Sequence, residues 1–142
     1  MQDVTLKGRS IVEGHATGEA LVSRQPLSFL GGVEPADGKI IEKGHDLSGI
    51  CIKDKIFCFP SGHGSTVGSY VLYSLVKNGL APKGIVNRFA DPVVVVGAII
   101  SNVPMVDQID IEQIKTGDIV EVDGAKGIVK IHKKERAEAV CT

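Results

Sequence analysis

One strand-to-helix stretch decides how this chain folds: residues 55–77 read KIFCFPSGHGSTVGSYVLYSLVK. The apolar run at 55–59 predicts a short buried strand, which Pro60 ends. After a glycine-rich turn, Ser65 begins the clearest helix of the chain, because a serine there accepts hydrogen bonds from the free amides of the first turn. Strands and helices in alternation are the units from which α/β domains are built.

The predicted helix has one apolar face and a defined end. Gly79 supplies the C-terminal stop, and Pro82 prevents the helix from continuing. Apolar side chains recur every four residues, and two more widen the face: Val67, Val71 and Leu75, then Leu72 and Val76.

Upstream of this stretch, turns and short strands alternate. Residues 31–38 contain three glycines and a proline and predict a loop of the kind that often carries function. Asp54 lies between two apolar runs and predicts the turn of a hairpin. We expect strands at residues 5–8, 18–23, 39–41 and 49–52.

Downstream, Gly84–Asn87 predicts a short buried strand. Asp91 and Pro92 form a helix-start pair, although the valines that follow favour a strand. We predict a helix at 92–101, because 104–107 then forms the returning strand of a βαβ unit. Strands at 119–122 and 127–131 flank a hairpin-type Asp-Gly turn. The chain is therefore expected to form one strand-rich domain of mixed α/β class over residues 1–142, with two main helices.

Composition excludes several classes of protein. The chain has 142 residues, 43% of them hydrophobic, which suits one folded domain. Its 16 basic and 17 acidic residues give a formal charge of −1, so no cationic field supports nucleic-acid binding. The basic run at 130–136 indicates a solvated C-terminal segment. With no apolar run of about 18 to 20 residues and no signal-peptide pattern, we expect a cytoplasmic protein without a membrane partner.

The three cysteines, Cys51, Cys58 and Cys141, show no paired spacing. An odd number fits reduced thiols better than a disulfide framework. Cys51 and Cys58 lie seven residues apart among apolar neighbours, unlike the pairs that bind zinc or clusters. We therefore expect buried structural thiols and no metal site in this chain.

The turn at 60–70 has the character of an anion site. Free amides and the helix dipole at such a turn favour a carboxylate or phosphate, although a plain capped helix would have the same pattern. It is not a P-loop, because the lysine of that motif is absent. A Ser–His pair with His63 is conceivable, but the nucleophile elbow of hydrolases is missing. Hydroxyl groups cluster where one cap would suffice, at Ser61, Ser65, Thr66 and Ser69.

Other polar residues carry weaker signals. Arg9 lies just before a glycine-rich segment, and Arg88 lies just after a predicted buried strand. An arginine in such a place can bind a carboxylate or phosphate bidentately. Ordinary surface ion pairing remains the alternative for both. The remaining histidines are expected to be surface or hydrogen-bonded residues rather than ligands: His15, His45 and His132.

Three segments together resemble the small subunit of the aconitase X family. They are the loop GGVEP at 31–35, the block PSGHGSTVGSY at 60–70, and ADP at 90–92 with GAI at 97–99. The resemblance runs in order from about residue 8 to residue 129, and the GSTVGSY block is its specific part. Within the family, the sequence is most similar to archaeal subunits that act on a phosphorylated hydroxy acid.

The resemblance implies a swivelling β/β/α domain similar to the mobile C-terminal domain of aconitases, here as a separate polypeptide. It implies a large partner subunit that carries an iron–sulfur cluster, no cofactor in this chain, and an active site between the two subunits. The implied reaction is dehydration of (R)-5-phosphomevalonate to trans-anhydromevalonate 5-phosphate in an archaeal mevalonate route to isoprenoids. The small subunit is then active only with its partner.

The resemblance also implies roles for single residues. The family's catalytic serine corresponds to Ser65, which would act as the general base beside the substrate carboxylate. The neighbouring Gly62, His63, Gly64 and Thr66 would shape the anion site. Many relatives are expected to have a lysine where this chain has His63, which puts a charge role at that position in doubt.

Three other functions remain open at this point. A related subunit could act on another hydroxy acid, such as cis-3-hydroxy-L-proline. A phosphohistidine swivel domain has a similar architecture and would use His63 as carrier, but the Thr-Ser-His context of that family is absent. A non-catalytic regulatory subunit would use the glycine loops as its interface.

Overall fold

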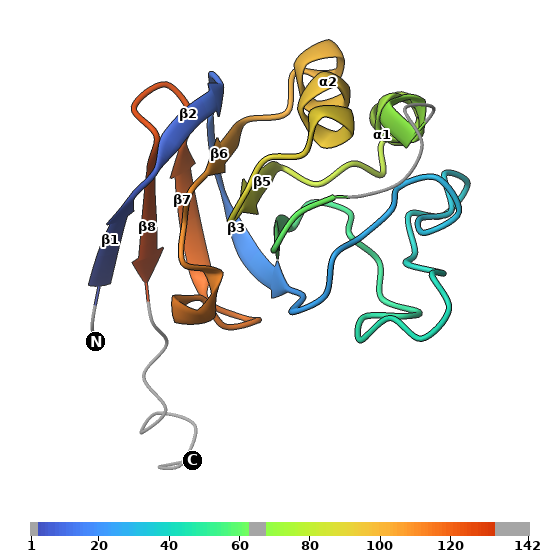
Figure 1. Ribbon diagram of the computed structural model, residues 1–142, viewed down its shortest axis with the longest axis horizontal. Helices are drawn as coiled ribbons and strands as arrows, with labels where there is room; N and C mark the ends of the chain where they lie inside the picture. Colours follow the sequence, from blue (N-terminus) through green and yellow to red (C-terminus); the bar gives the residue numbers. More distant parts are fainter. Residues whose placement is uncertain (1–2, 63–67, 133–142) are drawn as a thin grey trace.

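The computed structural model describes residues 3–62 and 68–132. Two sheet layers and one helical layer lie side by side (Figure 1). The strands are β1 (Asp3–Lys7), β2 (Arg9–Val12), β3 (His15–Val22), β4 (Ile56–Phe59), β5 (Gly84–Asn87), β6 (Met105–Asp107), β7 (Ile119–Asp123) and β8 (Ile128–His132). The helices are α1 (Gly68–Lys77), α2 (Pro92–Ser101) and the short 3₁₀ helix η1 (Ile111–Gln113).

The strands are hydrogen-bonded in the order β1-β8-β7-β3-β4-β5-β6-β2. β3 joins the two sheet layers, because its first part pairs antiparallel with β7 and its last three residues pair parallel with β4. From β3 to β6 all pairs are parallel, while β2 closes the edge antiparallel to β6. β1 and β2 lie at opposite ends of this order although only Gly8 separates them in sequence, so the sheet must curl to bring its edges together.

The central strands contribute side chains to two hydrophobic cores, one on each face of the sheet. In β4, Phe57 and Phe59 point to the helical side, whereas Ile56 and Cys58 point to the layer formed by β7, β8 and β1. The same alternation places Leu21 and Ala20 of β3 in different cores. All four residues of β4 and of β5 are buried. Burial on both faces explains why these strands read as continuous apolar runs.

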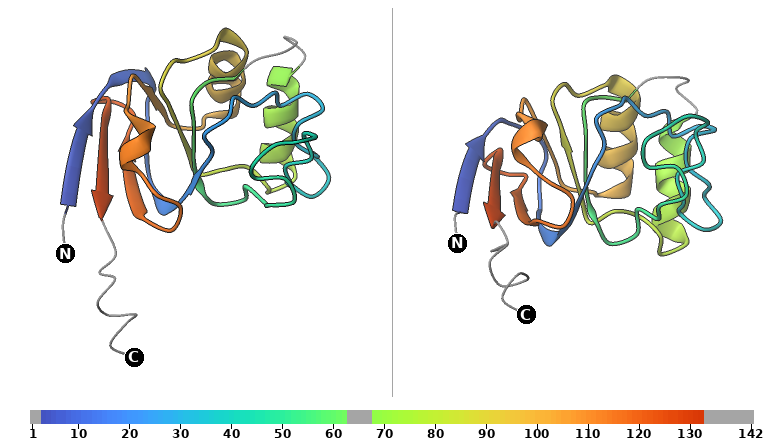
Figure 2. Two further views of the ribbon diagram at one scale, coloured as in Figure 1. Left: turned by 60° about the horizontal axis from the view of Figure 1, so that its bottom comes forward. Right: turned by 90° about the horizontal axis from the view of Figure 1, so that it is seen from below.

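The predicted βαβ unit is confirmed. α2 connects the parallel strands β5 and β6, and the Asp91 carboxylate accepts the amide of Val93 at 3.0 Å as an N-cap. The valines at 93–96 favour a strand locally, but they form a helix because the connection between two parallel strands must pack against the sheet. A Cβ on Gly97 would lie 3.3 Å from the Ser69 Cα, so a glycine is what lets α1 and α2 approach closely (Figure 2).

Two predicted strands and one predicted hairpin are wrong. Residues 39–41 and 49–52 form only isolated bridges, Val33 to Ile40 and Lys39 to Cys51. Ile40 and Ile52 are buried in the core on the helical side without belonging to a ladder, whereas Ile41 and Ile50 are exposed. Asp54 does lie in a turn, with φ of +60°, but no hairpin forms, because β4 pairs in parallel with both of its neighbours.

Some element bounds also differ from expectation. β3 begins at His15 rather than residue 18, and β2 was not predicted because no residue in it is fully buried. Val76 is exposed, so the apolar face of α1 is narrower than its spacing suggested. The expected cap Ser65 and the stripe residue Val67 lie outside the described residues. Gly79 ends α1 with φ of +72°, as predicted.

Of the two described thiols, one is buried as predicted and the other only in part. Cys58 is fully buried, and desolvation raises the pKa of its thiol. Cys51 is half-buried, with its Sγ 3.5 Å from the carbonyl oxygen of Asp37. Cys141 lies outside the described residues. Neither described thiol forms a disulfide. No helix in the described part of the chain is long and apolar enough to cross a bilayer.

A histidine at the end of β8 makes the stability of the sheet depend on pH. Hydrogen bonds to Asp3 and Glu121 raise the pKa of His132 above its usual value near 6.5. The protonated form is therefore favoured in the folded state. Its contribution to the free energy of unfolding is fully present below about pH 6.5 and is lost as the pH rises through the folded-state pKa. His132→Gln should lower the urea midpoint at about pH 5.5 and little at about pH 9. Asp3→Asn should do the same, and an equal loss at both pH values would contradict this origin.

Candidate functional site

The candidate site lies where four parallel strands end. β3, β4, β5 and β6 share a direction, so their carboxyl ends lie along one edge of the sheet. In α/β proteins, ligands bind outside this edge. The residues that follow the strands are Ser23 and Arg24, then Pro60, Ser61 and Gly62, then Arg88, and finally Gln108.

The predicted catalytic segment begins and ends beside the first turn of α2. His63, Gly64, Ser65 and Thr66 lie outside the described residues. On one side of them, a Cβ on Gly62 would collide with Cγ2 of Val94 and lie 3.4 Å from the Asp91 carboxylate. On the other side, a Cβ on Gly68 would lie 3.3 Å from Val93. Both glycines are therefore places where the chain passes closely over α2.

Arg9 is paired with a buried carboxylate at the same edge. Its Nε and Nη2 donate to the two oxygens of Asp107 at 3.0 and 2.8 Å, and this bond raises the pKa of Arg9. Asp107 is 1% exposed and also accepts the amide of Ala90 at 2.9 Å. The pair ties β2 to the loop that leads into α2. Its expected role in substrate binding remains a prediction.

Arg88 and Arg24 converge on one carboxylate. Nη2 of Arg88 lies 3.2 Å from Oε2 of Glu112, and Nη1 of Arg24 lies 3.9 Å from Oε1 of the same residue. These side chains line a cavity of about 230 Å³ together with Val22, Pro60 and Ile111. Ion pairing, the alternative that the sequence left open, is thus present for Arg88 as for Arg9.

A second, more open cavity of about 530 Å³ adjoins the first. Arg88 and Glu112 line both cavities, so their ion pair lies between the two. Phe89 also lines the second cavity and is 67% exposed. Gln108 contributes with a positive φ of 61°, which is uncommon for a residue with a side chain. Such backbone geometry is frequent near functional sites.

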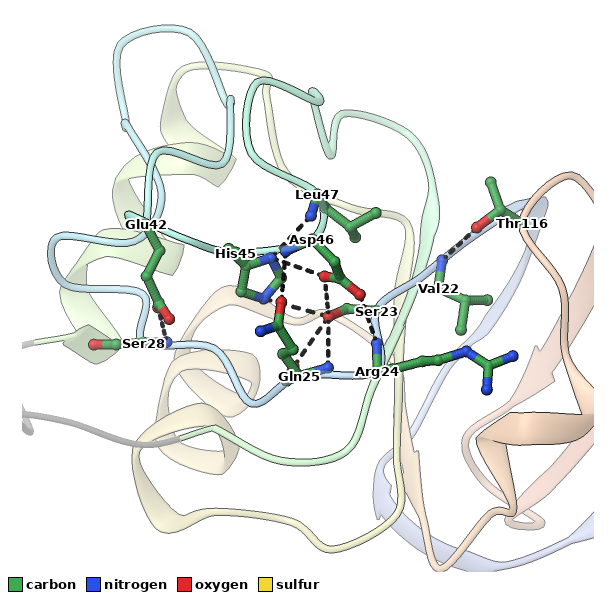
Figure 3. A network of polar contacts seen from close by, with 10 residues as sticks. All are labelled: Val22, Ser23, Arg24, Gln25, Ser28, Glu42, His45, Asp46, Leu47 and Thr116. Atoms are coloured by element: carbon green, nitrogen blue, oxygen red, sulfur yellow. Dashed lines mark hydrogen bonds and ion pairs between the residues drawn. The ribbon is translucent and has the colours of Figure 1, made fainter.

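A buried polar network holds the loop that carries Arg24 (Figure 3). The Ser23 hydroxyl lies 3.3 Å from Nε2 of His45 and 2.8 Å from Oδ1 of Asp46, and it accepts the amide of Gln25 at 3.0 Å. The other oxygen of Asp46 accepts the amide of Arg24 at 3.0 Å. The Arg24 side chain points away from this network. The loop backbone is therefore fixed while the guanidinium is left available at the edge.

His45 has a partner on each ring nitrogen. Its Nδ1 lies 3.1 Å from both the Leu47 amide nitrogen and Oδ1 of Asp46. The amide donates to Nδ1 when the nitrogen is unprotonated, and the carboxylate accepts from it when it is protonated. His15 and His132 both pair with Glu121 near the surface. The prediction that these three histidines are surface or hydrogen-bonded residues is confirmed.

Ser23, His45 and Asp46 are the three residue types of a hydrolase triad, but their geometry is structural. The Ser23 side chain is fully buried, so its oxygen has no access to a substrate. Its hydroxyl also contacts Asp46 directly instead of only through the imidazole. The network positions a loop, as buried and fully bonded polar clusters commonly do.

We expect Ser23→Ala to lower the free energy of unfolding by about 1 to 3 kcal/mol, because it removes the hydroxyl partner of the buried His45 ring and of the partly exposed groups of Gln25 and Asp46. Ser28→Ala is the matched control, since that hydroxyl belongs to the same loop but donates to Leu30 near the surface. Chemical denaturation followed by circular dichroism measures both. Equal effects of the two substitutions would contradict the structural role of the network.

Sequence reasoning missed Arg24, Glu112 and the His45 network. Arg24 directly follows a predicted strand, as Arg88 does, and this shared position was the available signal. Glu112 carried no signal, because it enters the site from η1, a helix of three residues. The network joins residues more than twenty positions apart, and no local pattern announces such contacts.

Comparison with known proteins agrees with this geometry. The family model described as the aconitase X swivel domain matches residues 5–131. The phosphomevalonate dehydratase small subunit of Methanocaldococcus jannaschii is 57% identical over 129 residues, covering 91% of this chain and 98% of the relative. That of Methanocella arvoryzae is 54% identical, covering 89% and 98%. The crystal structure of Thermococcus kodakaraensis aconitase X in its holo form matches with a TM-score of 0.90 at 52% identity, covering 92% and 99%.

Two sheet layers and a helical layer define a β/β/α domain. This chain belongs to the aconitase X swivel family. The fold class and the family resemblance expected from the sequence are both confirmed.

Proposed function

We propose that this chain is the small subunit of a phosphomevalonate dehydratase. The observation that carries the proposal is its identity of 54 to 57% to small subunits of that name, over about nine tenths of the chain. Near-complete coverage of the relatives supports a shared activity rather than a shared domain alone. The chain is then part of a hydro-lyase that removes water from (R)-5-phosphomevalonate and forms trans-anhydromevalonate 5-phosphate.

We assign the general base to Ser65. Its alkoxide takes the proton from the carbon next to the substrate carboxylate, and the electrons of that C–H bond form the new double bond. The tertiary hydroxyl leaves from the adjacent carbon and is protonated to water. A serine needs its oxyanion stabilised to act in this way, and amides near a helix start favour negative charge.

The partner is a large aconitase X subunit, in keeping with the small-subunit names of the relatives. We place the iron–sulfur cluster on that partner, because no three His, Cys, Asp or Glu side chains gather as a metal site within residues 3–62 and 68–132. The cluster would supply Lewis acidity toward the departing hydroxyl. This chain contributes the base and the anion-binding edge, and the active site lies between the subunits in the cytoplasm.

Reconstitution with the large subunit tests the proposal. The two chains are co-expressed and purified without oxygen, and the product from 5-phosphomevalonate is followed by phosphorus NMR. We expect the complex to form the anhydro product and each subunit alone to be inactive. A complex that acts on cis-3-hydroxy-L-proline and not on 5-phosphomevalonate would show that the enzyme is a family member with a different substrate. Activity of the large subunit alone would make this chain regulatory and overturn the proposal.

A further inference from the structure

Two guanidinium groups face a single carboxylate at the edge of the sheet. Arg24 follows β3 and Arg88 follows β5, and between them lies Glu112, with one oxygen toward each arginine at 3.9 and 3.2 Å. All three line the cavity of about 230 Å³. Within the described part of the chain, the Glu112 carboxylate forms ion pairs only with these two arginines. The position between the two arginines is therefore occupied by a carboxylate of the protein itself, that of Glu112.

The backbones of both arginines are fixed by hydrogen bonds from other loops. The amide of Arg24 donates to Asp46 at 3.0 Å, and the residue before it is anchored in the buried network of His45. The amide of Arg88 donates to the Pro60 carbonyl, and its own carbonyl accepts the amide of Gln108, both at 3.0 Å. The two side chains therefore extend from fixed backbone positions, which reduces part of the ordering that ligand binding requires.

The internal carboxylate is weakly held. The side chains of Arg24, Arg88 and Glu112 are 71%, 40% and 62% exposed. Ion pairs at exposed positions contribute little to stability, so a stronger anion displaces such a carboxylate readily. Asp110 is a second carboxylate near Arg88: its Oδ1 lies 3.7 Å from Nη2 of Arg88, and the same oxygen caps η1 by accepting the Glu112 amide at 3.2 Å. When Glu112 turns outward, two positive charges face one negative charge.

We propose that Arg24 and Arg88 bind the phosphate group of the substrate between them, and that Glu112 is the counter-ion that takes its place when the site is empty. The inference rests on the proposed function, which supplies a phosphorylated substrate. A phosphate carries close to two negative charges and matches the planar donor groups of arginine bidentately. The cavity is smaller than the roughly 300 to 1,000 Å³ of sites that enclose a drug-sized ligand, so it suits the phosphate group and not the whole substrate.

The assembled complex with 5-phosphomevalonate tests this assignment. Arg24→Gln and Arg88→Gln should each raise KM about 10- to 100-fold, since each loses charged hydrogen bonds, while kcat changes little. Glu112→Gln should lower KM several-fold, because the internal competitor is gone. Lys130→Ala, an exposed cation on β8 far from this edge in sequence and layer, is the control and should behave as wild type.

Two inhibitors distinguish the phosphate from the carboxylate of the substrate. Inorganic phosphate should inhibit the wild-type complex and lose potency in both arginine variants. Mevalonate, which keeps the carboxylate and lacks the phosphate, should inhibit all of them equally. Weaker inhibition by mevalonate in the arginine variants would mean that the arginines hold the carboxylate, and would overturn the proposal.

The proposed function and the phosphate site fail in different ways. A wild-type complex that converts 5-phosphomevalonate, with arginine variants of unchanged KM, would overturn the phosphate site and leave the function standing. A wild-type complex without that activity would overturn the function. In that case a phosphorus NMR titration with inorganic phosphate still decides the site: line broadening that disappears in Arg24→Gln and Arg88→Gln supports it, and broadening unaffected by these substitutions overturns it.

Discussion

Turnover of the assembled enzyme is expected to fall about 100- to 10,000-fold in Ser65→Ala, because a positioned general base contributes a factor of that size. Stability should change far less. The serine is also the expected N-cap of the helix, and losing a cap costs about 1 kcal/mol. The measurement pairs initial rates with 5-phosphomevalonate and denaturation of the same preparation. The Ser65→Ala complex should therefore lose most of its turnover while keeping nearly all of its stability.

Ser74→Ala is the matched control for this substitution. It removes a hydroxyl from the same helix, where Ser74 is half-buried and its carbonyl accepts the amide of Asn78 at 3.0 Å. The control complex should keep wild-type turnover. A Ser65→Ala complex that retained a tenth or more of the wild-type rate would remove Ser65 from the role of base. Failure of that variant to bind the large subunit would show instead that the serine is needed for assembly.

Gly62→Ala is expected to lower both activity and stability. A Cβ at this position collides with Cγ2 of Val94, which is 2% exposed in the core beneath the helices. Overpacking of this kind costs about 1 to 3 kcal/mol of unfolding free energy. The displaced segment leads directly to Ser65, and a shift of about 1 Å in a catalytic group costs roughly 100-fold in rate. The effect on turnover should exceed what the loss of folded protein explains.

A second substitution tests the cause. Val94→Ala alone is expected to destabilise by creating a cavity, but it also removes the methyl group that Gly62→Ala meets. The double variant should therefore be more stable than the sum of the single effects predicts, with a coupling of about 0.5 to 3 kcal/mol. Turnover of the double variant should recover together with its stability. Strict additivity would show that the close contact at Gly62 is not what makes the glycine necessary.

The elements that could be predicted are those in which local pattern and tertiary packing agree. The strand Gly84–Asn87 and the helix 92–101 have the expected bounds, because a buried parallel strand needs an apolar run and a crossover helix needs a capped start. Residues 39–41 and 49–52 have the apolar content of strands but pack as loops. Ile40 and Ile52 are buried there without a strand partner, and Ile41 and Ile50 are exposed, so a short apolar run by itself does not establish a strand.

The predictions for the site differ in what the structure can say of them. The serine-rich turn at 60–70 rests on residues adjacent in sequence, and it stays a prediction because residues 63–67 lie outside the described part of the chain. The arginine pair was half found, since Arg88 stood out and Arg24 did not. Nothing local indicates that η1 brings Glu112 between them, because this contact joins residues 88 positions apart for Arg24 and 24 apart for Arg88.

By itself, the sequence determined the class of the domain and the family to which the chain is similar. These depend on the order of neighbouring residues, and neighbouring residues set hydrophobic period, capping and turn chemistry. Only the tertiary structure decided which charges meet at the edge of the sheet. Arg9 and the buried Asp107 form their ion pair across 98 positions because β2 pairs with β6, and strand pairing is decided by the whole fold.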